Sequence, residues 1–217
     1  MTFGSEEIGL ILLSLRIACV AVAVSLPFAI GTALILTRRP FWGQSALNIA
    51  VHLPLVLPPV VTGYALLVLF SPNALLGRWL EVIFGTGIAF RWTGAALAAA
   101  IMAFPLFVRA IRQSLEAVDG GLQEAALTLG RSRLGIFFTI TLPLCWPGIL
   151  AGIVLAWAKA LGEFGATITF VSNIPGQTQT IPTAIYLALQ VPGDEPAALA
   201  LILVSVTISA GALIASE

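Results

Sequence analysis

The sequence predicts an all-α integral membrane protein with about five transmembrane helices. Of its 217 residues, 59% are hydrophobic and only 9% are charged, and the mean hydropathy is +1.05, far above the range of soluble domains. Bilayer hydrocarbon is about 30 Å thick, so a helical span needs roughly 20 mostly apolar residues. The chain shows no alternating ten-residue strand pattern, and lipid excludes irregular backbone, so the spans are expected to be helices.

Five apolar runs are long enough to cross the bilayer, and they cover residues 11–36, 46–70, 93–110, 142–161 and 197–215. The first run lacks a basic start and carries Arg16 within it, which favours a retained anchor over a signal sequence. We expect the Arg16 side chain to reach the outer interface along its apolar stem.

The basic residues predict the orientation, because arginine and lysine gather in short cytoplasmic loops. Six arginines follow the first run or lie around the loop 112–141, namely Arg38, Arg39, Arg109, Arg112, Arg131 and Arg133. Only Arg78 and Arg91 fall on the opposite side. We therefore expect a single membrane domain over residues 1–217, with the loop 112–141 and the C-terminus in the cytoplasm and the N-terminus outside.

The loop 112–141 contains residues that typically begin and end short helices. Asp119 is expected to cap a short helix, Gly130 to end it in the left-handed conformation, and Ser132 to cap a second helix. On the first helix, residues at helical spacing form a small apolar face beside Glu124, made of Leu122, Ala125, Ala126 and Leu129. This face either packs on the protein's own helix ends or receives a partner.

Prolines interrupt the second apolar run. Pro54, Pro58 and Pro59 remove backbone donors, which lipid tolerates only where neighbours or a cavity satisfy the freed carbonyls. Residues 57–63, which include Thr62 and Gly63, are therefore either pore-lining or hinge backbone, or a kink that serves packing alone.

Two glycines break the chain again after the fourth run, at Gly162-Glu163-Phe164-Gly165. In one interpretation the helix ends at the outer interface, with Glu163 in water and Phe164 among lipid headgroups. In the other, the bent backbone lines a permeation path, Phe164 lies near a gate, and Glu163 pairs with Lys159 one turn earlier. Residues 167–190 are too polar to span, and 181–190 are expected to form a short helix on the outer side.

Several functions are excluded by residues that the chain lacks. A phosphate-binding G-x-x-x-x-G-K-[ST] loop needs a lysine, and the sole lysine, Lys159, lies between two alanines. His52 is the sole histidine, which removes histidine metal clusters and a serine protease triad, and a hydrogen-bonded packing role is expected for it. Neither half of the chain has the charge pattern of a nucleic-acid-binding protein, and Cys19 and Cys145 are expected to pack rather than pair. We predict no catalytic residue, no metal and no cofactor in this chain.

The loop also carries a motif. From Glu124 to Pro143 the chain reads E-A-A, three residues, G, nine residues, I, one residue and L-P. This spacing resembles the signature of bacterial ABC importer permease subunits, the binding-protein-dependent transport system inner membrane component family. The resemblance implies the type I ABC importer permease fold and a short helix that docks into a groove on an ATPase. It assigns ATPase coupling to Glu124, Ala125, Ala126 and Gly130, with Leu142 and Pro143 anchoring the return to the membrane.

Four further segments, at residues 53–61, 104–109, 161–166 and 173–180, are similar to the molybdate permease branch, with sulfate and tungstate permeases as alternatives. That branch implies a homodimer in the bacterial inner membrane that imports molybdate by alternating access. It also implies two ABC ATPase subunits, which bind ATP and Mg, and a periplasmic oxyanion-binding protein received on residues 71–92 and 167–190.

The residues expected along the translocation path are Pro58, Pro59, Thr62, Gly63, Glu163, Phe164 and Gly165. An alternative of another class is an ion-coupled secondary transporter that uses the charges of Arg16, Lys159 and Glu163. Such carriers have more spans and internal repeats, and no convincing repeat is found here.

Overall fold

The computed structural model describes residues 5–37 and 40–214, and every regular element within these ranges is helical. The first half contains α1 (Ser5–Thr37), α2 (Gln44–Val56), α3 (Pro59–Phe70), α4 (Leu75–Phe84) and α5 (Trp92–Glu116). The second half contains α6 (Gly120–Thr128), α7 (Arg133–Ile136), the π-helical turn η1 (Phe137–Thr141), α8 (Leu142–Leu161), α9 (Gly165–Val171), α10 (Ile181–Ala188) and α11 (Glu195–Ile214). The predicted all-α fold is confirmed.

The predicted set of about five spans is confirmed, with one of them broken. Four stretches of the described chain are long and apolar enough to cross a membrane, namely Glu7–Thr37, Trp92–Glu116, Arg133–Leu161 and Glu195–Ile214. The predicted bounds were too short for the third and fourth runs, because the helix continues to Glu116 in the third and begins already at Arg133 in the fourth. Ala215, the predicted end of the last run, lies outside the described residues.

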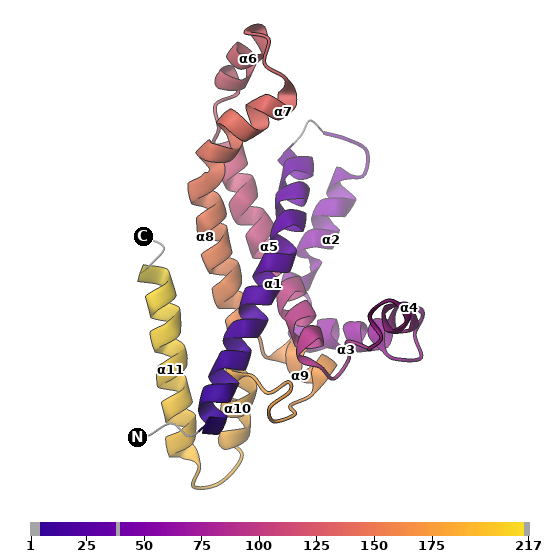
Figure 1. Ribbon diagram of the computed structural model, residues 1–217, viewed down its shortest axis with the longest axis vertical. Helices are drawn as coiled ribbons and strands as arrows, with labels where there is room; N and C mark the ends of the chain where they lie inside the picture. The colour runs from indigo at the N-terminus through magenta and orange to yellow at the C-terminus, as the bar shows by residue number, and fades with distance from the viewer. Residues whose placement is uncertain (1–4, 38–39, 215–217) are drawn as a thin grey trace.

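The second predicted span, over residues 46–70, is broken at the prolines that were expected to disrupt it. α2 and α3 meet at an angle of 113°, and α3 turns away from the direction of the long helices and leads sideways to α4 (Leu75–Phe84) (Figure 1). Leu57 is extended, with φ −71° and ψ 143°, as is usual for a residue before proline. Pro58 caps α3 and Pro59 begins it, because neither residue has a backbone N–H to continue α2. The disruption predicted at these prolines is therefore a sharp bend.

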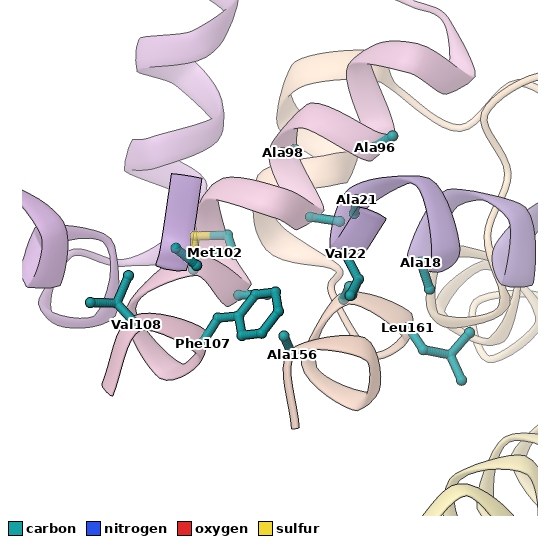
Figure 2. Close-up of a cluster of buried hydrophobic side chains, with 14 of the residues drawn as sticks. Ala18, Ala21, Val22, Ala96, Ala98, Met102, Phe107, Val108, Ala156 and Leu161 are labelled. Carbon is teal, nitrogen blue, oxygen red and sulfur yellow. The ribbon is translucent and has the colours of Figure 1, made fainter. Parts of the chain in front are cut away.

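The core lies between α1, α5 and α8, and much of it is alanine. Figure 2 shows buried side chains from these three helices, including Ala18 and Ala21 of α1, Ala98 of α5 and Ala156 of α8. Small residues let helices approach closely, which is how membrane helices gain packing energy when lipid offers no hydrophobic drive. Phe107 fills the remaining space and is fully buried.

The α3–α9 contact joins the two helices that follow the breaks in the chain. A Cβ built on Gly63 would lie 2.5 Å from the Ala166 carbonyl oxygen, and a Cβ on Gly165 would lie 2.8 Å from Pro59 Cβ. Glycine at both positions therefore lets the two short helices pack backbone against backbone.

The two ends of the bundle differ. α6 and α7 project from one end, whereas α10 and the start of α1 lie at the other (Figure 1). At that second end the Ile181 N–H donates to Ser14 Oγ at 2.9 Å, which ties α10 to α1. Arg38 and Arg39, used above for orientation, lie outside the described residues.

The close approach of α3 and α9 predicts opposite effects for one substitution at two helical glycines. Gly63→Ala forces a methyl group into the Ala166 backbone and should destabilise the protein by about 1–3 kcal/mol. Gly31→Ala, in α1, meets no atom within 4 Å and should be neutral or stabilising by up to about 1 kcal/mol. Detergent-titrated unfolding of the purified protein measures both, and equal effects at the two sites would contradict this packing.

Candidate coupling helix and translocation elements

α6 is a short helix that is capped at both ends. Asp119 Oδ1 accepts the Gly121 N–H at 2.8 Å, as its predicted N-cap role requires. At the other end Gly130 has φ +79°, its N–H reaches Leu127 O at 3.0 Å, and the Arg131 N–H reaches Ala126 O at 3.1 Å. This bond pair is a Schellman motif, in which a left-handed glycine satisfies the last carbonyls of a helix. Both predicted caps are confirmed.

The segment that follows α6, from Arg133 to Leu161, is a nearly continuous helix. Ser132 Oγ accepts the Gly135 N–H at 3.1 Å and caps α7, as predicted. α7, η1 and α8 then form one 29-residue stretch from Arg133 to Leu161. Pro143 lies in the first turn of α8, directly after the wide π turn. Pro143 accounts for the π turn at this place, because its ring clashes with a carbonyl one turn earlier and it has no backbone N–H.

The outer surface of α6 is not covered by the rest of the described chain. Glu124 and Ala125 are exposed, and Leu129 is 84% exposed. Only Ala126 of the predicted apolar face is buried, at 8% exposure. Of the face that was expected either to pack on the protein's own helix ends or to receive a partner, only Ala126 is packed within the described chain. Exposed apolar residues continue onto the neighbouring elements at Leu134 and Phe138.

Glu163 lies at the elbow between α8 and α9, and its side chain is only 2% exposed. Lys159 Nζ donates to Glu163 Oε2 at 2.9 Å, which confirms the predicted pair. The Ala166 N–H donates to Glu163 Oε1 at 3.0 Å, so the same carboxylate caps the first turn of α9. The interpretation that places Glu163 in water at a helix end is therefore wrong.

The predicted path residues come together from both breaks. Pro59 contacts Gly165, Gly63 contacts Ala166, and Glu163 lies at the start of α9. Phe164 packs against Tyr186 of α10, with ring centroids 5.0 Å apart. Tyr186 was missed by sequence reasoning, since it belongs to a distant segment with no motif of its own. Thr62 Oγ1 is buried and has no hydrogen-bond partner within the described chain.

The remaining membrane charges are not assembled into one site. The Arg16 guanidinium lies 3.9 Å from the centroid of the Trp92 ring, a cation–π contact between α1 and α5. His52 Nδ1 is 2.8 Å from Asn48 O, which confirms a hydrogen-bonded histidine. Arg16 thus has a different partner from Lys159 and Glu163, so the three charges do not form the shared site that an ion-coupled carrier would need.

Among curated proteins, this chain is 55% identical to the molybdenum transport system permease protein ModB of Escherichia coli, over 100% of this chain and 95% of that one. It is 38% identical to the sulfate transport system permease protein CysT of the same organism, over 80% of this chain and 62% of that one. The likeness to the molybdenum permease is thus both higher and nearly complete in both chains.

Solved structures show the same fold. A bacterial alginate ABC transporter, crystallised in complex with an alginate pentasaccharide-bound periplasmic protein, matches 98% of this chain with a TM-score of 0.76 and 19% identity, over 77% of that chain. The MetNI methionine ABC transporter in an inward-facing conformation matches 99% of this chain with a TM-score of 0.74 and 15% identity, over 96% of that chain. The model of the family described as binding-protein-dependent transport system inner membrane component matches residues 25–216, and the chain belongs to that family.

Proposed function

We propose that this chain is the membrane-spanning permease subunit of an ATP-driven ABC importer for molybdate. The observation that carries the proposal is the likeness to a molybdenum permease over nearly the full length of both chains. The chain is not an enzyme, and ATP is hydrolysed by a separate subunit. Sulfate is the weaker alternative, because the likeness to a sulfate permease covers less of both chains.

In the proposed assembly, two copies of the permease enclose the path, two ATPases bind ATP and Mg, and a periplasmic protein delivers the oxyanion. α6 and the C-terminus face the cytoplasm and the N-terminus faces outside. Support comes from Arg109, Arg112, Arg131 and Arg133, which lie in the last turns of α5 or in the α6–α7 segment. The alginate transporter provides a precedent for an importer of this fold in complex with a periplasmic protein.

Coupling takes place at α6. Its exposed face, with Glu124 and Ala125, docks into a groove on the ATPase, and the small side chain of Ala125 permits close approach. Gly130 and Ser132 fix the turn that joins α6 to α7. A displacement of α6 is therefore transmitted to the next helix rather than absorbed in a loose loop.

The long helical stretch from α7 through α8 carries this displacement to the elbow at Glu163. α8 packs along α5, where Gly152 lies against Phe107 and Ser114 Oγ donates to Cys145 O at 3.3 Å. Beyond the elbow, α9 packs on α3 through Gly63 and Ala166. Movement of α8 thus reaches both breaks, and ATP drives alternating access because the ATPases bind the two states of the permease with different affinities.

The function is tested by ATP-dependent uptake. Proteoliposomes that contain the permease, its ATPase and its binding protein should accumulate molybdate only with ATP inside. Excess sulfate should compete weakly, since the binding protein selects the anion first. Uptake driven by a proton gradient without ATP, or sulfate uptake that exceeds molybdate uptake, would refute the proposal.

Substitution of Gly130 should uncouple transport. Valine strains the left-handed backbone by about 1–2 kcal/mol, enough to lower the docked population of α6 by roughly tenfold. Gly130→Asn is the matched control, because asparagine tolerates this conformation. We expect Gly130→Val to reduce molybdate uptake per ATP hydrolysed while the complex still copurifies. Equal uptake by the two variants would argue against a role for this turn.

Because Lys159 and Glu163 form an ion pair, we expect the losses of stability and transport in the two single variants not to add in the double variant. Lys159→Met leaves a buried carboxylate unpaired and should cost about 3 kcal/mol and most transport. Glu163→Gln should be milder, because its amide oxygen still accepts the Ala166 N–H and Lys159 is 31% exposed. The double variant should be more stable than Lys159→Met alone, as measured by unfolding and by uptake. Additive losses would show that the pair does not act as a unit.

A further inference from the structure

A polar cavity of about 320 Å³ lies between α2 and α5 and opens to the surface, since Arg109, Gln113 and Glu116 on its lining are exposed. It is lined by Asn48, His52, Arg109, Arg112, Gln113 and Glu116. In a chain with only 9% charged residues, this cavity collects two arginines, a glutamate and the sole histidine. It is far larger than the roughly 10–15 Å³ that one water molecule needs.

The arginine donors in this cavity are only partly used. Arg112 Nε donates to Glu116 Oε1 at 2.7 Å, one turn along α5, which leaves the terminal N–H groups of that guanidinium free of this bond. Arg109 has no hydrogen-bond or ion-pair partner within the part of the chain that the structure describes. With Glu116 counted, the two arginines leave one net positive charge on the lining.

The neutral groups add donors. Because Asn48 O accepts only, His52 Nδ1 is the donor in their 2.8 Å bond, which orients the imidazole ring. The side-chain amides of Asn48 and Gln113 each carry an NH₂ group on the same lining. Charged and amide donors that converge on one space are what a tetrahedral oxyanion requires.

The neighbouring cavity shows that this polarity is local. A second space of about 480 Å³ between α1, α2 and α5 is lined by apolar residues and Ser25, among them Phe28, Val51 and Phe104. Val51 and His52 are adjacent in α2, so the same helix pair borders an apolar space and a polar one. The arginines occupy the last turns of α5, at the end of the bundle that carries α6 (Figure 1).

We infer that the cavity between α2 and α5 is a binding site for a tetrahedral oxyanion, held by Arg109 and Arg112. The ligand is either the free transported anion or the phosphate of an anionic lipid headgroup, which share this chemistry. If the ligand is the free transported anion, the inference rests on the proposed function, and the cavity is a binding site for that anion at the cytoplasmic end of the permease. If the ligand is a lipid headgroup, the inference does not depend on the proposed function.

The test uses the permease–ATPase complex without binding protein, in nanodiscs, with Arg109→Gln/Arg112→Gln compared with wild type. Equilibrium dialysis with molybdate in pure phosphatidylcholine measures the free anion. Native mass spectrometry in phosphatidylcholine with phosphatidylglycerol measures the bound lipid. We expect the double variant to bind one of these ligands at least about tenfold more weakly, since each removed arginine loses charge-assisted hydrogen bonds.

The matched control removes two exposed arginines outside the cavity, Arg78→Gln/Arg91→Gln. The control should bind as wild type does, and copurified ATPase should be unchanged in both variants. Arginine-dependent binding of molybdate supports the free-anion form, and arginine-dependent retention of phosphatidylglycerol supports the lipid form. Wild-type binding of neither ligand, or equal losses in the two double variants, overturns the inference.

The outcome is separate from that of the proposed function. If wild-type complex imports molybdate with ATP but the cavity binds neither ligand, only the cavity inference fails. If the complex does not import molybdate but retains phosphatidylglycerol through Arg109 and Arg112, the proposed function fails and the cavity site stands.

Discussion

The buried carboxylate of Glu163 is the interaction on which the half of the bundle remote from α6 depends. A helix that breaks inside an apolar bundle frees backbone groups, and those groups need partners. Glu163 accepts the Ala166 N–H with one oxygen and the Lys159 ammonium with the other. The same carboxylate thus stabilises the end of α8 and the start of α9. Only with α9 held in this way do Ala166 and Gly165 meet Gly63 and Pro59 of the broken second span.

The two ends of the molecule are joined by one long helical stretch. α6 is short and depends on its caps for its shape, while the stretch from Arg133 to Leu161 is long, and part of it is buried against α5. α6 is followed by the capped turn at Gly130 and Ser132, then by the helical stretch from α7 through α8, and then by the break before α9. No long loop separates these elements. In the proposed importer this is how ATP binding by another subunit reaches backbone breaks at the opposite side of the membrane.

The parts that could be predicted from sequence are those determined by local chemistry. Asp119, Gly130 and Ser132 act within one turn of themselves, and the Lys159–Glu163 pair spans one turn of helix. Prolines located the break in the second span but not its 113° angle, which depends on the packing of α3 against α9. α4 was not predicted as a helix, and the contact of Phe164 with Tyr186 joins distant segments. Arg109 and His52 were each noticed, but their shared cavity exists only because α2 and α5 lie side by side.

The central claim is that movement of α6 reaches the opposite end of the bundle through α8. It is tested most directly by spin-label distances between the two copies in the transporter, with labels on Leu129 after α6 and on Leu189 after α10, both of which are exposed. On ATP binding, we predict that the Leu129 distance shortens while the Leu189 distance changes in the opposite direction. A change at Leu129 with none at Leu189 would contradict the account, because α8 would then not transmit the movement.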